Sequence, residues 1–273
     1  MDYKKALFSL LIISACSENK QNFGELPKII KPIESDFIPV TLDELGVPSQ
    51  VDQLLEYSSF QIGYSYQFKQ ALWSGYVLLP ELVRVVNDRV DSFKEELLIP
   101  TQYRATLNDY KNSGYHRGHL APNATLDHTD LSMSETFYLS NITAQQAMFN
   151  LNDWRQLETY VRDCLEQYAD QDRVFVFTGP YFDGVLQAIG DSNIPVATGF
   201  YKVIYEFNHG AASALAFIAP HNDFDYANLN NYLRSIDFIE KITHLDFAMN
   251  LPQDLEVALE SNVSPVCDIP TGL

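Results

Sequence analysis

The chain has 273 residues, of which 46% are hydrophobic and 13% aromatic. This composition supplies enough apolar surface for a sizeable core, so it excludes a disordered, low-complexity or collagen-like chain. Its 18 basic residues stand against 36 acidic ones, giving a net charge of -18 at pH 7. That charge argues against sequence-independent adhesion of the whole surface to nucleic acid or anionic lipid, so any site for a polyanion must be local.

The first predicted segment is an export signal over residues 1–15. Lys4 and Lys5 precede an apolar run at 6–13, which is far shorter than the ~20 residues that a membrane-spanning helix needs. The sequence Ile-Ser-Ala-Cys at 13–16 resembles a bacterial lipobox, which would make Cys16 the lipidated first residue of the mature protein. The alternative is an ordinary signal peptide with an incidental cysteine. We expect an exported protein of the cell envelope, anchored by lipid to a bacterial membrane.

Residues 16–36 are expected to form a tether between this lipid and a folded domain, because they are polar and show little apolar periodicity. Beyond the lipidated cysteine, only Cys164 and Cys267 remain. Export into an oxidising compartment permits a disulfide between them. One buried and one free thiol is the open alternative.

Residues 37–273 are predicted to be one domain, because no internal repeat, long linker or charge block interrupts them. Its first clear element is a strand at 73–79, which is rich in aromatic and β-branched residues. A helix is predicted over 153–168, where Trp154, Leu157, Val161 and Leu165 repeat at helical spacing.

Three apolar runs follow at 174–177, 203–207 and 214–218. Gly, Pro, Asn and Asp residues bound these runs, which favours central strands of one sheet. Another helix is predicted over 229–242, and the tail from Asn250, which contains three prolines, is predicted to wrap over the surface. The pattern indicates an α+β fold with a mixed, mostly antiparallel central sheet flanked by helices.

The strongest local motif is Gly-Tyr-His-Arg-Gly-His-Leu-Ala-Pro-Asn at 114–123. Gly114 and Pro122 disfavour a regular helix, so a loop or short strand should hold His116, Arg117 and His119 together. Histidine has an unperturbed pKa near 6.5, which leaves a neutral base available at neutral pH. Arginine supplies a guanidinium group that is always positively charged and carries several N–H donors. The motif therefore places an imidazole base and a guanidinium cation together on an irregular loop or short strand.

A second cluster runs from Phe137 to Glu158. Asn150 precedes the predicted helix and can offer an oxygen to a hard cation such as Mg²⁺, which takes few protein ligands and keeps several waters. In a regular helix Glu158 lies about 12 Å further along the axis, so it would orient a metal-bound water instead of binding the ion beside Asn150. The alternative is that Asn150, Asn152 or Asp153 merely caps the helix.

In this order and spacing, the two clusters resemble the DNA/RNA non-specific endonuclease family, whose active site is a ββα-metal finger. Segments 64–76, 174–181, 199–205 and 232–247 are also similar to the family, so the resemblance covers roughly residues 52–251. It implies an endonuclease that hydrolyses DNA and RNA with little sequence preference, through contacts to phosphate. It also implies one Mg²⁺ ion, for which Mn²⁺ can substitute, and a homodimer in some relatives.

The resemblance also implies roles for individual residues. His119 aligns with the general base and Arg117 with the arginine near the phosphate. Asn141 matches the asparagine that braces the site. Asn150 aligns with the direct ligand of the ion, and Glu158 with the carboxylate that holds metal-bound water.

Arg89 matches an upstream phosphate-binding arginine of the family. Residues 84–119 contain six basic and five acidic side chains, a local charge of +1 in a chain of -18. A locally focused site is therefore expected, with binding that weakens as salt rises.

The sequence departs from the family at one position of the motif Asp-Arg-Gly-His, where His116 stands in place of the acid. If the acid orients its neighbours, its loss would lower metal affinity or turnover by ~10- to 100-fold. A catalytically silent surface lipoprotein that binds nucleic acid or a host partner is therefore the alternative function. Retention of His119, Asn150 and Glu158 favours activity.

Other polar clusters have simpler interpretations. Asp127 to Asp130 are predicted to form a turn and a helix cap rather than a metal site. His209, His221 and His244 have no partner motif and are expected to be surface or packing residues.

Overall fold

The computed structural model describes residues 23, 26–83, 87–165, 173–208 and 210–266, apart from the side chain of Cys164. An eight-stranded sheet crosses the molecule in the order β1-β11-β10-β7-β4-β3-β2, with β12 paired to β11. Every neighbouring pair in this sheet is antiparallel. The strands are β1 (Ile33–Glu34), β2 (Gln53–Glu56), β3 (Phe60–Ser65), β4 (Gln70–Leu78), β7 (Arg173–Tyr181), β10 (Gly199–Asn208), β11 (Ala211–Pro220) and β12 (Leu233–Arg234).

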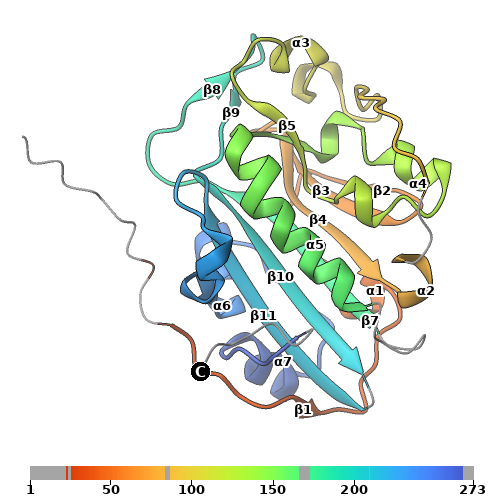
Figure 1. Ribbon diagram of the computed structural model, residues 1–273, viewed down its shortest axis with the longest axis vertical. Coiled ribbons are helices and arrows are strands. Elements are labelled where there is room, and N and C mark those ends of the chain that lie inside the picture. Colours follow the sequence, from red (N-terminus) through yellow and green to blue (C-terminus); the bar gives the residue numbers. More distant parts are fainter. Residues whose placement is uncertain (1–22, 24–25, 84–86, 166–172, 209, 267–273) are drawn as a thin grey trace, which may run out of the picture.

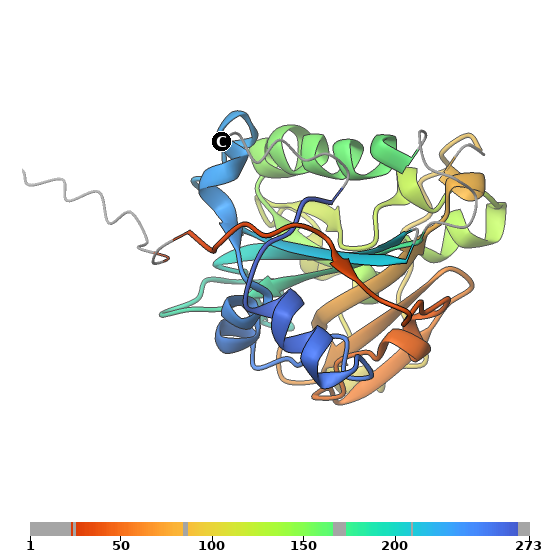
Figure 2. The ribbon, with the colours of Figure 1, turned by 90° about the horizontal axis from the view of Figure 1, so that it is seen from below.

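Helices cover both faces of the sheet. Figure 2 shows the sheet nearly edge-on, with α5 (Trp154–Cys164) on one side and α6 (Ile236–Thr243), α7 (Gln253–Glu260) and α1 (Leu42–Leu45) on the other. The remaining short helices are α2 (Pro80–Val83), α3 (Leu107–Tyr110) and α4 (Asp130–Glu135). Short 3₁₀ turns span Thr101–Tyr103, Asn123–Thr125, Leu139–Asn141 and Tyr226–Tyr232.

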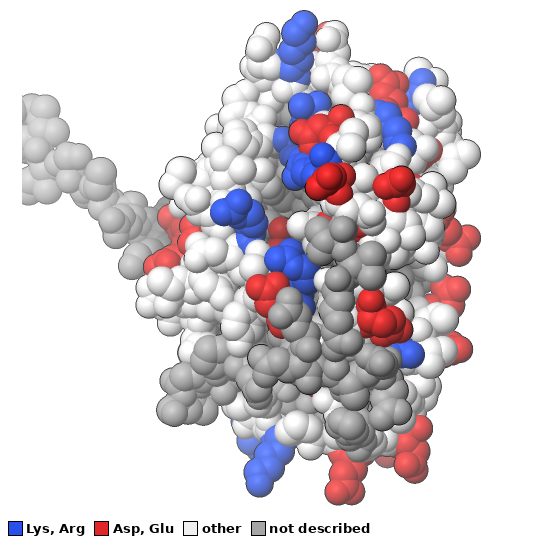
Figure 3. Space-filling model, turned by 45° about the vertical axis from the view of Figure 1, so that its right-hand side comes forward, with Lys and Arg blue, Asp and Glu red and all other residues white. Residues whose placement is uncertain are grey.

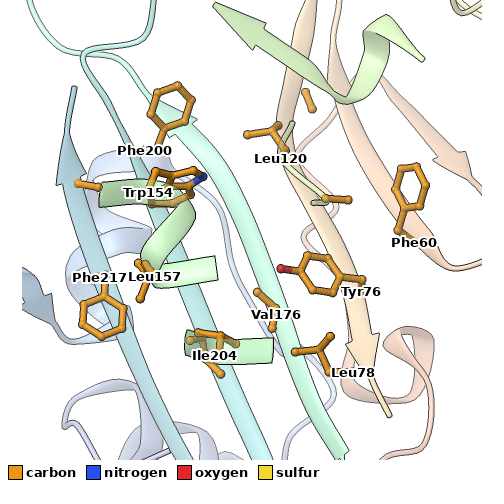
Figure 4. Packing of buried hydrophobic residues seen from close by; sticks show 14 of the residues in the cluster. Phe60, Tyr76, Leu78, Leu120, Trp154, Leu157, Val176, Phe200, Ile204 and Phe217 are labelled. Atoms are coloured by element: carbon orange, nitrogen blue, oxygen red, sulfur yellow. The ribbon is translucent and has the colours of Figure 1, made fainter. Parts of the chain in front are cut away.

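The core on the α5 side explains why this helix lies across the sheet. Trp154 and Leu157 project from α5 onto Phe200 and Ile204 of β10 and Val176 of β7 (Figure 4), and all five are buried. Complete burial of one such side chain contributes about 1.5–3 kcal/mol. The buried stripe therefore fixes α5 on the sheet and leaves its polar face toward solvent.

A small ββα unit sits beside this core. The strand β5 (His116–His119) pairs antiparallel with β6 (Ile142–Gln145), and a π-helical turn (Phe149–Asp153) leads from β6 into α5. In Figure 1 this unit lies at the upper end of α5. Nearby, β8 (Ala188–Ile189) and β9 (Ile194–Pro195) form a separate two-stranded ribbon.

The structure confirms the α+β class, the strands expected at 73–79, 174–177, 203–207 and 214–218, and the amphipathic helix. The helix predicted over 229–242 is wrong in its first half. Residues 226–232 form two 3₁₀ turns separated by a kink at Asn228, 233–234 pair with β11, and α6 begins only at Ile236. Pairing with the neighbouring strand overrides the local helical pattern.

The predicted surface tail is also wrong. Residues 253–260 form α7, which buries Leu255 and Leu259, and Val263 pairs with Ile29. Two leucines four residues apart are enough to anchor a helix on one face, although prolines flank it.

The described part of the expected tether packs against the domain. Ile33 and Glu34 pair with Ala212 and Ala211 at the edge of the sheet. The folded unit therefore begins before residue 37. The export signal, Cys16 and Cys267 lie outside the described residues, so lipidation and the Cys164–Cys267 disulfide stay predictions. Among the helices that the structure describes, none combines the length and apolarity needed to cross a bilayer.

Three carboxylates cluster on the face opposite α5. Side-chain oxygens of Asp237, Glu240 and Glu260 lie within 4.8 Å of one another. Burial raises the pKa of Glu240 to about 7, and burial together with Glu240 raises that of Glu260 to about 9. Burial also raises the pKa of Asp237. The hydroxyl of Tyr205 donates to Glu260 Oε1 at 2.9 Å.

Because these three carboxyl groups have raised pKa values, we expect the protein to lose stability as the pH rises. The folded chain keeps protons on Glu240 and Glu260 that unfolded glutamates release near pH 4.5. The stabilisation that these protonated carboxyl groups give the folded state is therefore complete below pH 4.5. It is lost as the pH rises past 7 and then 9. Glu260→Gln keeps an acceptor for Tyr205 and should flatten the dependence of Tm on pH between 5 and 9. The exposed Asp254→Asn on the same helix is the control. An unchanged slope in Glu260→Gln would contradict this account.

Candidate active site

A single cavity of about 1340 Å³ brings together most of the residues predicted from the sequence. Arg89, Arg117, His119, Asn150 and Glu158 all line it. They come from the segment before α3, from β5, from the π turn and from α5. Residues up to 69 positions apart in the chain thus share one solvent-filled space.

The strand β5 presents two of these residues to the cavity. Arg117 and His119 are two residues apart, so their side chains leave the same face of the strand. A side chain in place of Gly118 between them would collide with the buried side chain of Gln145, which would have to move. His116, which replaces the family's acid, pairs with Gln145 and also borders the cavity.

The ring of His119 packs against two phenylalanine rings. Its centroid lies 5.6 Å from that of Phe93 and 5.0 Å from that of Phe137. Its Nε2 is shielded from solvent and has no hydrogen-bond partner among the described residues. Nδ1 is therefore the nitrogen through which this ring can exchange a proton with the cavity.

Burial lowers the pKa of His119 to about 3, with Arg89 and Arg117 acting in the same direction and Asp91 opposing them. The imidazole is consequently neutral at neutral pH. A neutral ring can accept a proton, which is the protonation state that a general base requires.

Two guanidinium groups stack on the same two phenylalanine rings that contact His119. The Cζ of Arg117 lies 3.9 Å from the ring centroid of Phe93, and that of Arg89 lies 5.3 Å from the centroid of Phe137. Arg89 also donates from Nε to Asp91 at 2.6 Å. Stacking fixes the plane of each guanidinium and leaves N–H donors for an anion in the cavity.

Asn141 is placed differently from the other predicted residues. It is buried, and it does not line the cavity. Its Oδ1 accepts from the backbone N–H of Ala121 at 2.9 Å, while Nδ2 donates to the carbonyls of Ala121 and Thr136 at 3.0 Å each. Asn141 therefore fixes the chain that leaves His119 and has no contact with the reacting space.

Asn150 sits in the π-helical turn that precedes α5. Its backbone N–H donates to the carbonyl of Gln146 at 2.9 Å, and its side chain makes no hydrogen bond within the described part of the chain. The capping alternative is not realised, because Asp153 makes no cap bond and instead accepts from the N–H of Tyr226 at 3.1 Å. Single π turns often occur at functional sites, and this one directs a free amide toward the cavity.

Glu158 lies on α5 above a buried lysine that the sequence analysis missed. Lys202 of β10 is fully buried, donates from Nζ to Thr178 Oγ1 at 2.8 Å, and lies 4.7 Å from the ring centroid of Trp154. Burial raises the pKa of Glu158, and the positive charge of Lys202 opposes that rise. Lys202 therefore favours the ionised carboxylate.

The donors in this cavity fit a hard divalent cation. Asn150 offers an amide oxygen free of other hydrogen bonds, and Glu158 offers a carboxylate across the same space. Mg²⁺ commonly binds through one or two protein oxygens and retains several waters. The two oxygen donors of this open cavity fit this mode of Mg²⁺ coordination.

The cavity is basic although the chain is acidic. It is bordered by five basic side chains, Arg89, Lys111, Arg117, Arg155 and Arg162, and by two acidic ones, Glu158 and Asp163. On the face in Figure 3, basic side chains extend from the top toward the centre, while the right-hand margin is mainly acidic. Arg155 and Arg162 were not expected from the sequence, although two arginines seven residues apart on one helix lie on the same side of it.

We expect Arg155 and Arg162 to contact phosphates beside the reacting one. Replacing both by Gln should raise the KM for DNA more than it lowers kcat, where a smaller loss is expected because Arg162 also helps to lower the pKa of Glu158. The slope of log(kcat/KM) against log[salt] should become shallower by about 1.4–1.8, the contribution of two phosphate contacts. Lys241→Gln, on the opposite face, serves as the matched control. A wild-type slope in the double variant would remove these two arginines from the substrate path.

Comparison with known proteins agrees with this geometry. The profile of the DNA/RNA non-specific endonuclease family matches residues 39–254. Nuclease C1 of Cunninghamella echinulata is 34% identical over 225 residues, which is 75% of this chain and 86% of that protein. Human mitochondrial endonuclease G is 34% identical over 223 residues, covering 77% of this chain and 74% of that protein.

A solved structure has the same fold. A chain in the crystal structure of the EndoG/EndoGI complex superimposes with a TM-score of 0.71 at 26% identity, covering 78% of this chain and 91% of that chain. Family profile, relatives and fold thus agree over the region that holds the cavity. The chain belongs to the DNA/RNA non-specific endonuclease family and is an endonuclease.

Proposed function

We propose that this endonuclease hydrolyses both DNA and RNA with little sequence preference and depends on Mg²⁺, with Mn²⁺ as a substitute. One observation carries the proposal: a neutral imidazole, two stacked guanidinium groups and a free amide oxygen border the same cavity. These are the groups needed to activate water, bind a phosphate and hold a cation.

His119 would accept a proton at Nδ1 from the attacking water. Arg117 and Arg89 would bind the non-bridging phosphate oxygens and neutralise the charge that grows on them. Asn150 would hold the divalent ion and Glu158 a water of its hydration shell, and the bound ion would supply Lewis-acid stabilisation to the phosphate and the leaving 3′ oxygen. The products would carry 5′-phosphate ends.

The arginines also tune the base. In the free enzyme the positive charges of Arg89 and Arg117 help to lower the pKa of His119. A phosphate bound to both groups would oppose that effect, so the imidazole would become more basic once substrate is present. The base is thereby neutral before binding and stronger after it.

The lack of sequence preference follows from the kind of contact. Guanidinium groups that bind phosphate position the backbone without distinguishing one base from another. An oxygen-liganded ion beside the scissile phosphate likewise makes no distinction between deoxyribose and ribose. Both DNA and RNA should therefore be substrates.

A nicking assay on residues 17–273 tests this proposal. Supercoiled plasmid and a single-stranded RNA should both be cut with Mg²⁺ and remain intact with a chelator. Absence of cleavage in wild type, under conditions where His116→Asp cuts, would favour the catalytically silent lipoprotein that binds nucleic acid or a host partner.

We further propose that the protein is exported and attached to a bacterial membrane through lipid on Cys16. Cys16→Ser should then appear in the soluble fraction, and retention in the membrane fraction would count against this attachment. Homodimer formation stays a prediction from the resemblance.

A further inference from the structure

His221 is buried at the end of β11, beside the turn that carries Asn150. It is 5% exposed, and its backbone N–H donates to the carbonyl of Thr198 at 3.1 Å. Its ring packs edge-on against Phe149 and Phe200, with centroids 5.3 and 5.4 Å away. The expectation of a surface or packing residue is therefore right about packing but misses its polar contacts.

Both ring nitrogens of His221 have backbone partners. Nδ1 lies 3.2 Å from the carbonyl oxygen of Ala197, which can only accept, so Nδ1 carries the proton. Nε2 is then free of hydrogen and accepts from the backbone N–H of Gln146 at 2.7 Å. The two partners thus define one neutral tautomer.

Gln146 connects this ring to Asn150. Its carbonyl accepts the backbone N–H of Asn150 at 2.9 Å, an α-helical i→i−4 bond that leads into the π-helical turn. Its side-chain amide also donates to Oδ1 of Asn222. Two consecutive residues after β11 therefore hold both the backbone and the side chain of Gln146.

We propose that His221 is a positioning residue that fixes the turn from Gln146 to Asn150 and hence the direction of the Asn150 amide oxygen. The inference rests on the proposed function, in which that oxygen binds the divalent ion. The groups that orient metal ligands commonly contribute ~10- to 100-fold to affinity or activity. The sheet thus sets the geometry of the ion site through a ring 71 residues further along the chain.

The decisive variant is His221→Phe, which keeps an aromatic ring against Phe149 and removes both hydrogen bonds. In the metal-free protein, amide exchange at Gln146 should accelerate at least tenfold, because its N–H loses its acceptor. Mn²⁺ affinity, measured from the EPR signal of the free ion, should fall ~10- to 100-fold. With Mg²⁺ at a fixed concentration, kcat should fall similarly while the KM for DNA stays within about twofold.

Phe224→Leu is the matched packing control. Phe224 also contacts the ring of Phe149, at 6.0 Å between centroids, but its side chain has no hydrogen-bonding group. This variant should lower Tm and leave amide exchange at Gln146 and Mn²⁺ affinity as in wild type. Equal loss of Mn²⁺ affinity in both variants would assign the effect to packing and overturn the proposal.

A second variant keeps the test decisive if His221→Phe does not fold. Asn222→Ala changes an exposed residue, removes the side-chain hydrogen bond to Gln146, and should weaken Mn²⁺ binding measurably. Wild-type Mn²⁺ affinity in the variants that fold would overturn the proposed role. Because amide exchange is measured without metal or substrate, failure of the nuclease assay and failure of this contact give different results.

Discussion

Replacing His119 by alanine should lower the rate of plasmid cleavage by about 10²- to 10⁴-fold, the usual contribution of a general base. The residue borders the cavity, its pKa is lowered to about 3, and Nδ1 is the ring nitrogen left to meet a water. The loss should appear in kcat at saturating DNA, because the arginines that bind phosphate remain.

His128→Ala is the matched control for this variant. His128 is half-buried outside the cavity, and its Nε2 lies 3.2 Å from Ser59 Oγ. It should cut at close to the wild-type rate. Circular dichroism and Tm of both variants establish that the fold persists. Turnover by a folded His119→Ala within twofold of wild type would exclude His119 as the base.

Asn150→Ala should have the second large effect, a loss of about 10²- to 10³-fold. Lewis-acid stabilisation is worth several kcal/mol, and each 1.36 kcal/mol is tenfold in rate. In the proposed function, the free amide of Asn150 holds the ion directly. Asn150→Asp keeps an oxygen ligand and should retain more activity than the alanine variant at the same Mg²⁺ concentration.

Asn152→Ala controls for damage to the π turn itself. Asn152 lies in the same turn, and its Nδ2 is 3.6 Å from Met148 Sδ. It should cut at close to the wild-type rate at every Mg²⁺ concentration. If the two alanine variants depend on Mg²⁺ identically, Asn150 is not the ligand.

Much of the fold could be predicted because its signals are local. The stripe Trp154, Leu157, Val161 and Leu165 is a property of twelve consecutive residues, and all four are buried as expected. The apolar strands are similarly continuous. The predictions for 229–242 and for the C-terminal tail failed because the conformation there depends on pairing with other segments of the chain. Leu233 pairs with Phe217, and Val263 pairs with Ile29.

The motif residues of the site were predictable for a similar reason. Arg117 and His119 are adjacent on one strand face, and Asn150 and Glu158 flank the start of one helix. Their meeting in one cavity depends on pairing of β5 with β6, which carries the chain from the motif to the helix. The resemblance to the family supplied that connection; composition and periodicity did not.

The supporting residues were not predictable in this way. His221 contacts Gln146 across 75 residues, and the contact of Lys202 with Trp154 crosses from sheet to helix. Lys202 did leave a signal, because it is the one charged residue in the otherwise apolar segment 199–205 and a buried charge requires a partner. His221 left none, since a single histidine after a strand has no characteristic pattern.

The overall charge of -18 correctly indicated that any basic site would be local. The basic residues of the cavity come from three separate segments, which the fold brings together so that five basic side chains outnumber two acidic ones there. A strongly acidic protein can therefore present a positive groove, at the cost of strong dependence on ionic strength.

The most direct test of the account is anomalous diffraction from a crystal of His119→Ala with Mn²⁺ and a short DNA duplex. We predict an Mn²⁺ peak in contact with the side-chain oxygen of Asn150, and a phosphate lying between this ion and residue 119. An ion bound elsewhere, for instance among Asp237, Glu240 and Glu260, or a phosphate beyond reach of residue 119, would contradict the account.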